Sequence, residues 1–377
     1  MHFAEDASTD AFEDPILLQS SSMSWRDRLH EKRCADCLGE LRLEGEAIHC
    51  TSCAAEWSVL GSMPYFAAGQ KHYHADVSQE HMRELIANTA DGHWRDAFET
   101  LMERLPAAHA RRIEANVLDE SRALGLALLP LGEGSRVLDI GCGWGALSIA
   151  MANTGVNVSS LDLAPLRARF TQLRAEQEGL DHLEVMIGGD RKHLPFPDNH
   201  FDAVILNGVL EWTADSRGGD PALVYREYLR EARRILKPGG MVYIGIENRT
   251  GLAYFRGVPE DHIELPFIAL MPRGLANRYA QWKRGEDYRT HTHNVSGYTK
   301  LMRDAGFEQH EFFWPHPDYR SPQLVFELND KAAMKRLLLP HSKSGVTRWI
   351  REKMIDSGLF RYLPHSYLIL GTKAGEQ

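Results

Sequence analysis

A glycine-rich segment that follows a short apolar run is the first stretch whose residue types suit chemistry. Residues 137–145 read Val-Leu-Asp-Ile-Gly-Cys-Gly-Trp-Gly, and helix-forming residues follow at 146–150. This pattern predicts a buried strand, a tight turn and a helix N-terminus. We expect the three glycines to leave space for a ligand, because any Cβ there would fill it. The carboxylate of Asp139 would repel a pyrophosphate, so the segment predicts a nucleotide-like ligand that carries a cationic amine.

Four of the five cysteines form two closely spaced pairs. The pairs are Cys34 with Cys37 and Cys50 with Cys53, in the spacing C-x2-C-x12-C-x2-C. Each pair can sit in a tight turn and offer two thiolates to one tetrahedral ion, and four such ligands leave no open position. The spacing therefore predicts a structural zinc ion that stabilises the fold. A disulfide or redox pair is the alternative, which the lack of a secretion signal disfavours.

Acidic residues follow two later predicted strands. The run at 156–162 ends in Asp162, about 20 residues after the glycine segment. A carboxylate at that place can accept hydrogen bonds from both hydroxyls of a ribose. Because Pro165 follows, the alternative role of Asp162 is to cap the next helix. The predicted strand at 183–187 is followed by a second acidic residue, Asp190.

Together with the turn Leu-Lys-Pro-Gly-Gly at 236–240, these segments resemble the class I S-adenosylmethionine-dependent methyltransferases. The resemblance implies that Asp139 lies near the amino group of the methionine moiety and that Asp162 binds the ribose. It also implies that Asp190 accepts a hydrogen bond from the adenine 6-amino group. Because ligands of open α/β sheets bind at the carboxyl ends of the strands, residues after the strand at 201–206 are expected to line the methionine side. The cofactor-binding set predicted in this way is Asp139, Gly141, Cys142, Gly143, Gly145, Asp162, Leu163, Gly189, Asp190, Arg191, Asn207 and Gly208.

The segment 34–66 resembles the small zinc-ribbon protein that activates tRNA, ribosomal RNA and release-factor methyltransferases. It carries both cysteine pairs, a predicted hairpin of 40–44 and 46–49, and the apolar segment Val-Leu-Gly-Ser-Met-Pro at 59–64. The resemblance implies a ribbon fused to its enzyme in one chain. It does not imply an RNA substrate, because such a ribbon can serve to cover an apolar face of the catalytic domain.

Strands and helices alternate from residue 136 onward, which predicts a parallel sheet with helices on both faces. We expect an α/β fold with a doubly wound, Rossmann-like sheet of seven strands; its antiparallel final hairpin is implied by the methyltransferase resemblance. The predicted strands are 136–140, 156–162, 183–187, 201–206, 241–246, 307–314 and 367–371. The predicted domains are a flexible acidic tail at 1–24, a zinc ribbon at 25–69, a helical cap of the cofactor pocket at 70–130, and a methyltransferase domain at 131–377 with substrate-facing insertions at 248–297 and 318–365.

Residues 76–130 show helical periodicity with one apolar stripe. The stripe consists of Met82, Leu85, Ile86, Trp94, Phe98, Leu101, Met102 and Leu105. We expect this stripe to be a packing surface, and contact with the substrate is the alternative.

The stretch between the fifth strand and a helix at 298–305 is long, and loops of this length are usually functional. Methyl transfer is an in-line displacement, so it depends on positioning the acceptor and excluding water. A hydroxyl acceptor also benefits from a general base. The candidates for that base are, in order, His262, Glu247, His291 and His293. The residues expected to contact the acceptor are Glu211, Trp212, Asn248 and Tyr298.

Two other interpretations of these histidines stay open. Histidines in a long loop are often structural or exposed. A divalent ion held by Glu260 or Asp261 together with the histidines is the other interpretation, although their spacing is less distinctive than that of the cysteines.

The composition is that of an ordinary globular protein, with 43% hydrophobic and 25% charged residues. No apolar run reaches the roughly 18 residues of a transmembrane helix. The first residues lack the basic flank and apolar core of a signal peptide, so we expect a cytoplasmic protein without membrane insertion. The net charge of −9 disfavours general attraction to nucleic acid.

We expect a methyltransferase that transfers a methyl group from S-adenosylmethionine to an oxygen or nitrogen atom of a small molecule, a sugar or a lipid-linked glycan. One alternative is an RNA methyltransferase, acting on ribosomal or transfer RNA, that uses the ribbon for docking. A non-catalytic scaffold is the other. A homodimer is compatible with the sequence, which does not decide the oligomeric state.

Overall fold

The computed structural model describes residues 3–5, 11–18, 25–68, 73–75 and 77–375 of the 377-residue chain. Its centre is one sheet of eight strands in the order β10-β9-β8-β11-β12-β15-β13-β14. The strands are β8 (Arg136–Ile140), β9 (Asn157–Asp162), β10 (Leu183–Ile187), β11 (Phe201–Asn207), β12 (Leu236–Glu247), β13 (Gln309–His316), β14 (Leu324–Glu327) and β15 (Ser366–Thr372). The first five are parallel, and β15 lies antiparallel between β12 and β13. The doubly wound sheet and its antiparallel end are therefore confirmed.

The sheet differs from the predicted one in two places. It has an eighth strand, β14, which pairs with β13 at the edge. In addition, β12 begins at Leu236, so the segment expected to be a turn before the fifth strand is part of that strand. A register shift between Phe201 and Ala203 of β11 marks where the Pro-Gly-Gly segment interrupts the regular pairing.

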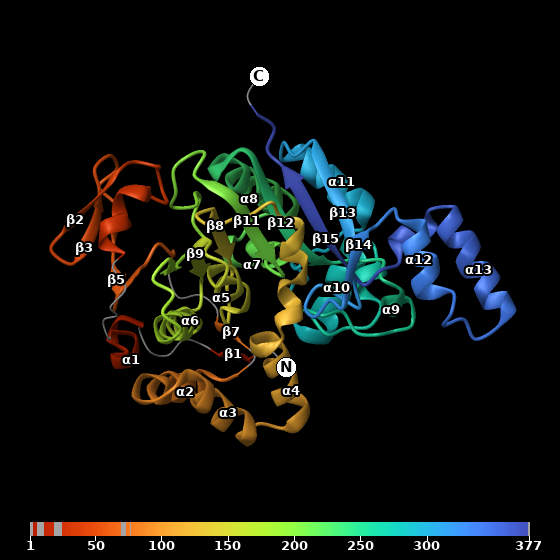
Figure 1. Cartoon of the computed structure of the whole chain (residues 1–377), viewed down its shortest axis with the longest axis horizontal. Helices are drawn as coiled ribbons and strands as arrows, with labels where there is room; N and C mark the ends of the chain where they lie inside the picture. The colour runs from red at the N-terminus through yellow and green to blue at the C-terminus, as the bar shows by residue number, and fades with distance from the viewer. Residues whose placement is uncertain (1–2, 6–10, 19–24, 69–72, 76, 376–377) are drawn as a thin grey trace.

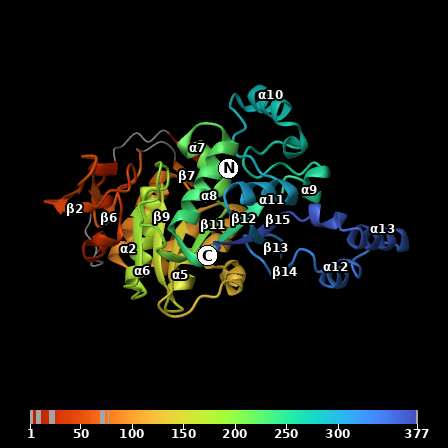
Figure 2. The same ribbon diagram turned by 90° about the horizontal axis from the view of Figure 1, so that it is seen from above.

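Alternate residues of the parallel strands are buried in two different cores, one on each face of the sheet. Leu138 and Ile140 of β8 belong to one core, and Val137 belongs to the other. Because both faces are covered, the strands are continuous apolar runs rather than alternating ones. One face carries α2 (Gln79–Asp91), α3 (Trp94–Arg104), α4 (Ala107–Leu118), α5 (Ala146–Ala152) and α6 (Pro165–Gln177); the other carries α8 (Pro221–Ile235) and α11 (Val295–Asp304) (Figures 1 and 2).

The apolar stripe of residues 76–130 packs against the sheet and its helices, as predicted. Met82, Leu85 and Ile86 of α2 are at most 1% exposed. Trp94 of α3 meets Phe170 of α6 edge to face, with ring centroids 6.4 Å apart. The stripe is thus a packing surface, and none of its eight residues lines the cavity described below.

The zinc-ribbon segment packs on the β10 end of the sheet (Figure 1). The expected hairpin is confirmed by the antiparallel strands β2 (Leu41–Glu44) and β3 (Ala47–Cys50), which β4 (Glu56–Trp57) extends. Trp57 and Phe66 are 3% and 1% exposed, and both lie in the same core as Leu161 and Met186 of the sheet. The hairpin β5 (Val59–Leu60) and β6 (Met63–Pro64) leads to Tyr65, which bridges to Ile187 of β10. The ribbon therefore shares its core with the central sheet.

The prediction of a flexible tail at 1–24 is wrong for residues 11–18. They form a short 3-10 helix, η1 (Ala11–Glu13), and α1 (Pro15–Leu18). Leu17 is 2% exposed, and the carboxylate of Asp14 lies 2.7 Å from the guanidinium of Arg83 on α2. The segment is ordered because it buries apolar side chains and pairs its charge. Residues 1–2, 6–10 and 19–24 lie outside the described part, and β1 (Phe3–Glu5) pairs with β7 (Tyr73–Ala75).

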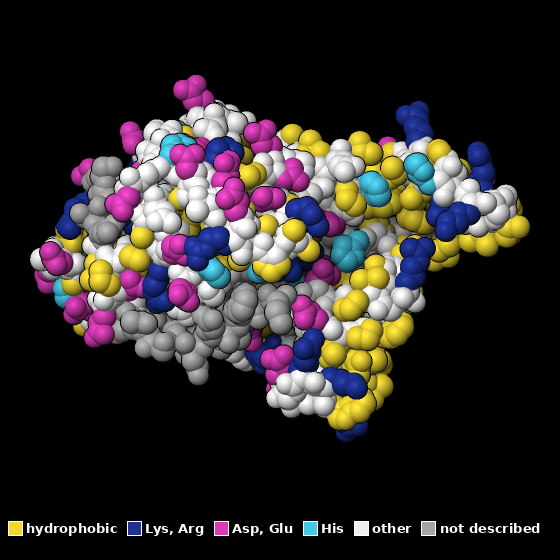
Figure 3. Space-filling view, turned by 90° about the horizontal axis from the view of Figure 1, so that it is seen from below, with side chains coloured by type: hydrophobic (Ala, Val, Ile, Leu, Met, Phe, Trp, Pro, Cys, Tyr) yellow, Lys and Arg dark blue, Asp and Glu magenta, His cyan; other side chains and the backbone are white. Residues whose placement is uncertain are grey.

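The two insertions are folded units rather than extended loops. Residues 248–297 contain α9 (Leu252–Phe255), a 3-10 turn η5 (Ile268–Leu270) and α10 (Arg273–Arg284), around a small core that includes Ile268 and Tyr288. Residues 318–365 contain β14, α12 (Lys331–Leu338), α13 (Gly345–Asp356) and η6 (Leu359–Tyr362). Figure 3 shows apolar side chains at the end of the molecule that carries α12 and α13, where Trp349 is 60% exposed. Within the described residues, no helix is both long and apolar enough to cross a membrane.

Because the ribbon and the sheet share one core, they should unfold together. We predict that Phe66→Ala lowers the free energy of unfolding by about 3 kcal/mol, since it removes a buried aromatic side chain. Leu359→Ala is the matched control, because Leu359 is 56% exposed and should change little. The measurement is urea unfolding followed by circular dichroism and tryptophan fluorescence. A separate early transition of the ribbon, or an unchanged midpoint for Phe66→Ala, would contradict a shared core.

Candidate active site

A cavity of ≈ 550 Å³ opens at the carboxyl ends of the parallel strands. Each of β8, β9 and β11 ends at it, which is where open α/β sheets bind ligands. Of the predicted cofactor and acceptor residues, those that line it are Asp139, Gly141, Cys142, Gly143, Asp162, Leu163, Gly189, Asp190, Asn207, Gly208, Glu211, Trp212 and His262. The predicted residues that do not line it are Gly145, Arg191, Glu247, Asn248, His291, His293 and Tyr298.

The glycine loop has the sharp turn predicted for it, but only one glycine leaves space toward a ligand. Gly141, Gly143 and Gly145 have φ values of +68°, +56° and +80°. A Cβ on Gly141 would lie 2.4 Å from the side chain of Val209, and a Cβ on Gly145 would lie 2.7 Å from that of Thr171. At Gly143 the nearest atom is 3.8 Å away. The expectation that all three glycines make room for a ligand is thus corrected, because two of them make room for protein side chains.

Asp162 holds the loop in place from the end of β9. One carboxylate oxygen accepts from the backbone N–H of Gly143 at 2.7 Å, and the other accepts from that of Ala164 at 2.8 Å. The second bond belongs to the local turn before α6, whose N-cap is Ala164 without a side-chain capping hydrogen bond, so Asp162 does not cap that helix. A carboxylate has further acceptor positions, so these two bonds leave Asp162 able to accept from hydroxyl groups at the cavity.

Asp139 is 2% exposed at the end of β8. Its carboxylate accepts from the hydroxyl of Ser148 at 2.6 Å, and that hydroxyl accepts from Ser160 at 2.9 Å. Burial raises the pKa of Asp139 to about 6, although the Ser148 hydrogen bond and the nearby Arg122 lower it. The group is therefore ionised at neutral pH in a buried setting that favours a cationic ligand.

Arg122 is a cavity residue that the sequence reasoning missed. It follows α4 and donates to the side-chain oxygen of Asn116 at 3.0 Å. Desolvation lowers its pKa, while the charge of Asp139 opposes that shift. A cation and an anion thus face one end of the cavity, which suits an amino-acid zwitterion. Arg122 lies in a 3-10 segment, η3 (Glu120–Leu128), that has no motif to mark it.

The ribbon reaches the cavity through Asp190. Both carboxylate oxygens of Asp190 lie 3.0 Å from the backbone N–H of Ala68, just after the ribbon. The side chain of Arg191 points to the ribbon instead, 5.0 Å above the ring of Trp57 and 3.5 Å from the carboxylate of Asp36. Arg191 therefore ties the sheet to the ribbon rather than lining the cavity with its side chain.

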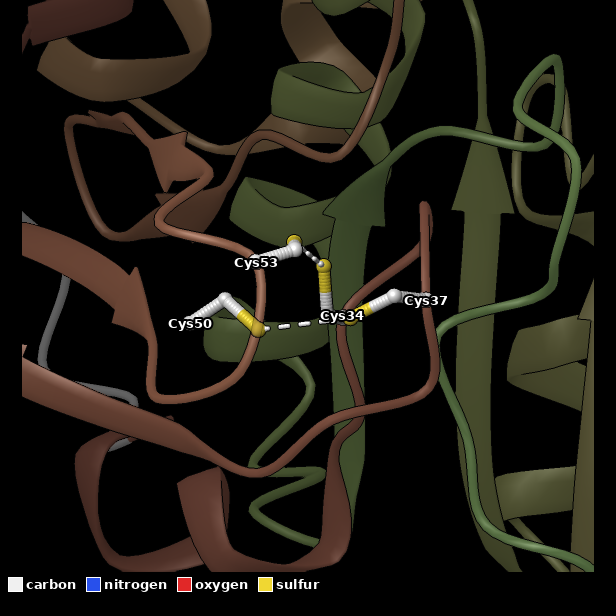
Figure 4. A group of neighbouring side chains, drawn as sticks. All are labelled: Cys34, Cys37, Cys50 and Cys53. Carbon is white, nitrogen blue, oxygen red and sulfur yellow. Dashed lines mark hydrogen bonds between the residues drawn. The ribbon is translucent and has the colours of Figure 1, made fainter.

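The four ribbon cysteines converge on one point (Figure 4). Their sulfur atoms all lie within 4.8 Å of one another, with 3.7 Å between Cys34 and Cys53 and 3.5 Å between Cys37 and Cys50. A tetrahedron of zinc–sulfur bonds has edges of about 3.8 Å. All four are free thiols, and the backbone N–H groups of Gly39 and Ser52 donate to two of them. The arrangement fits a structural zinc ion.

A second cluster of metal-binding residue types lies at the other end of the cavity. Nε2 of His262 is 3.5 Å from a carboxylate oxygen of Glu211 and 3.8 Å from one of Glu247. Its Nδ1 is 2.7 Å from the carboxylate of Glu260. Although burial disfavours the charged ring, these three carboxylates raise the pKa of His262 well above its usual value. The ring of His262 thus lies among three carboxylates that favour its charged form.

Glu247 is fully buried at the end of β12. It contacts His262 but does not line the cavity. Its Oε1 accepts from the hydroxyl of Tyr319 at 2.9 Å and from the guanidinium of Arg320. Arg320 also donates to Asp261 at 3.1 Å. Tyr319, Arg320 and Asp261 all line the cavity, and the first two were missed because they belong to an insertion without a recognisable motif.

The structure places His291 and His293 away from the cavity. Nε2 of His291 is 2.9 Å from the carbonyl of Tyr288, and the ring of His293 packs edge to face with Tyr298. Burial lowers the pKa of His291 to about 4 and that of His293 to about 3. Neither of these predicted bases lines the cavity, and both make contacts with nearby tyrosine residues.

Asn248 and Tyr298, predicted to contact the acceptor, make structural hydrogen bonds instead. The side-chain amide of Asn248 donates to the carbonyls of Tyr362 at 2.8 Å and Pro364 at 2.7 Å. The hydroxyl of Tyr298 donates to the carbonyl of Glu247 at 3.0 Å. Asn248 is thus tied to the segment before β15 and Tyr298 to the end of β12, and neither residue lines the cavity.

Sequence similarity links this chain to methyltransferases. A ubiquinone biosynthesis O-methyltransferase of Pseudomonas aeruginosa is 34% identical over 166 residues, which are 43% of this chain and 61% of that protein. One from Xanthomonas axonopodis is 29% identical over 202 residues, which are 53% of this chain and 74% of the relative. The chain thus spans less than two thirds of the length of the Pseudomonas relative.

Solved structures to which this chain is similar include phosphoethanolamine N-methyltransferase 2 of Haemonchus contortus in complex with S-adenosyl-L-methionine. Its TM-score is 0.41 at 17% identity, over 68% of this chain and 53% of that one. The complex of a Haloferax volcanii methyltransferase activator with a methyltransferase has a TM-score of 0.40 at 21% identity. The match covers 75% of this chain and 98% of that one. A family model described as a methyltransferase domain matches residues 138–244, from β8 to β12. The similarity to a methyltransferase domain thus covers the part of the chain from β8 to β12.

Proposed function

We propose that the protein transfers a methyl group from S-adenosylmethionine to a hydroxyl group of a small molecule. One observation carries the proposal: a single cavity connects the buried carboxylates of Asp139 and Asp162 with the polar cluster of Glu211 and His262. The first pair suits a cofactor with a cationic amine and a ribose. The second pair suits an acceptor that loses a proton.

The cofactor's amino-acid end fits between opposite charges. Its ammonium group would lie at Asp139 and its carboxylate at Arg122, while the ribose hydroxyls would meet Asp162. Asn207 supports this placement, because its buried side-chain nitrogen and oxygen atoms have no hydrogen-bond partner within the described chain. Next to Ala68, the carboxylate of Asp190 would accept a hydrogen bond from the adenine amino group. When bound, the cofactor supplies an activated methyl group on its sulfonium.

The acceptor end of the cavity is formed by Glu211, Trp212 and His262. The methyl group moves from sulfur to the acceptor oxygen as the carbon–sulfur bond breaks, so the cavity must orient the oxygen and exclude water. The hydroxyl proton passes to the carboxylate of Glu211. Burial, followed by the charge of Glu247, raises the pKa of Glu211, which makes its carboxylate a stronger base than an exposed one.

The curated relatives support oxygen as the methylated atom, since they are named as O-methyltransferases of ubiquinone biosynthesis. They give no support to nitrogen, sugar or lipid-linked glycan acceptors. The ribbon does not argue for RNA, because its apolar residues Trp57 and Phe66 are buried against the sheet. A small-molecule hydroxyl is therefore the acceptor class that we propose.

The direct test is transfer of label from methyl-labelled S-adenosylmethionine into a cell extract divided between a small-molecule fraction and an RNA fraction. We predict label in the small-molecule fraction that is resistant to ribonuclease. Asp162→Ala should reduce the incorporation at least tenfold, because it removes the ribose acceptor. Asp181→Ala is the matched control, since its exposed side chain lies outside the cavity. Label that disappears after ribonuclease treatment would contradict the small-molecule proposal and indicate an RNA substrate.

Cofactor binding should depend on pH through Asp139. With a pKa of about 6, its carboxylate is protonated as the pH falls below that value and then no longer attracts the ammonium group. We predict an affinity for S-adenosylhomocysteine about tenfold lower at pH 5 than at pH 7.5. Calorimetric titration gives the measurement. The Asp139→Asn variant should bind weakly at both pH values. Equal affinities of the unchanged protein at pH 5 and pH 7.5 would count against Asp139 as the partner of the ammonium group.

We also infer that one zinc ion is bound by Cys34, Cys37, Cys50 and Cys53 and stabilises the ribbon. Elemental analysis of the purified chain should find about one zinc per molecule. Cys50→Ser should lower both the zinc content and the melting temperature, because four ligands are needed to close the site. Cys142→Ser is the matched control and should keep its zinc. A metal-free chain of equal stability would refute the inference.

A further inference from the structure

We propose that Glu211, Glu247 and His262 bind a divalent cation at the acceptor end of the cavity, and that this cation holds the acceptor oxygen. The second half rests on the methyl-transfer function proposed above, whereas cation binding itself does not. The three residues come from the turn after β11, the end of β12 and the insertion that follows it. Only folding brings them together.

The distances suit a shared ion. One nitrogen of His262 and one oxygen from each glutamate all lie within 4.8 Å of one another. The measured separations are 3.5 Å from His262 to Glu211 and 3.8 Å from His262 to Glu247. Ligand atoms around a divalent ion are about 3 Å apart in an octahedral site and about 3.4 Å apart in a tetrahedral one. Small side-chain movements would therefore complete the coordination.

Glu260 orients the imidazole as a metal ligand. Its Oε1 lies 2.7 Å from Nδ1 of His262, which directs Nε2 toward the two other glutamates. Its Oε2 accepts from the backbone N–H groups of His262 and Ile263, both at 2.9 Å. Glu260 is thus fully occupied and acts behind the ligand. A carboxylate on the far nitrogen of a histidine is the usual support of metal-binding histidines.

Unpartnered buried oxygens provide an independent observation. Glu211 is 1% exposed, and neither of its carboxylate oxygens has a hydrogen-bond partner within the described chain. The same is true of Oε2 of Glu247, which is 0% exposed, although its Oε1 is held by Tyr319 and Arg320. Buried carboxylate oxygens without hydrogen bonds are costly. All three atoms lie around the point where the cation would bind.

The charge balance also favours a dication. The carboxylates that meet here are those of Glu211, Glu247, Glu260 and Asp261. Facing them are the guanidinium of Arg320 and the ring of His262, and His365 lies 3.6 Å from Asp261. With His262 neutral, as a ligand must be, the carboxylates outnumber the permanent positive charge. A divalent ion would supply positive charge at the point where these carboxylates meet.

Two carboxylates and one imidazole suit Mn²⁺, Mg²⁺ or Zn²⁺. Three protein ligands leave positions open, and the positions toward Glu211 and His262 face the cavity. The acceptor oxygen would occupy one of them. The ion would lower the pKa of the acceptor hydroxyl and fix its direction. The proton would pass to the carboxylate oxygen of Glu211 that does not bind the ion, and no electron transfer is involved.

The test is Mn²⁺ titration of the full chain, with zinc already in the ribbon, followed by electron paramagnetic resonance. We expect one bound Mn²⁺ per chain, and an affinity at least tenfold lower for Glu211→Gln and His262→Ala. Glu286→Gln is the matched control, because Glu286 is an exposed carboxylate on the same insertion. Binding that is equal in all four proteins, or no binding to the unchanged chain, would overturn the site.

A spectroscopic signature keeps the test decisive if a variant fails to fold. Mn²⁺ bound to the unchanged protein should show a nitrogen coupling from the His262 imidazole in pulsed paramagnetic resonance. Bound Mn²⁺ without nitrogen coupling would overturn the ligand set. Failure of methyl transfer with intact Mn²⁺ binding would reject the proposed activity and leave the cation site standing, so the two proposals can fail separately.

Discussion

The burial of carboxylates at one edge of the sheet is the constraint on which the rest of the structure depends. Asp139 is the second-last residue of β8, Asp162 ends β9 and Glu247 ends β12, and all three are at most 6% exposed. Parallel strands bring their carboxyl ends to the same edge. Buried anions destabilise a fold unless hydrogen bonds or cations meet them. The loop amide of Gly143 and the guanidinium of Arg320 are two of the groups that do so.

Segments from outside the sheet close the cavity at this edge. Leu17 and Asp14 of the N-terminal segment line it together with Arg83. The helices before β8 and the later insertions contribute further lining residues, such as Arg122 and Tyr319. The ribbon meets this site through the hydrogen bond from Ala68 to Asp190, and elsewhere a buried ion pair of 2.5 Å joins its Lys32 to Glu184 of β10.

Local patterns predicted the parallel strands and the residues at their ends, because a buried strand and the turn after it are encoded in neighbouring residues. They did not reveal β14, the ordered segment at 11–18 or the cavity residues Arg122 and Tyr319, since these depend on contacts between distant segments. The motif around His262 drew attention to that histidine. Its pairing with Glu211 and Glu247 required the fold, and it changes the role we assign to the ring.

The central claim is that this acidic edge holds S-adenosylmethionine with its methyl group directed at the cluster around His262. The measurement that tests it most directly is a crystal structure of the chain with S-adenosylhomocysteine. The account predicts the ligand's ammonium group at Asp139, its ribose hydroxyls on Asp162, and its sulfur facing the side of the cavity formed by Glu211 and His262. A ligand bound elsewhere, or bound in the reverse direction, would contradict it.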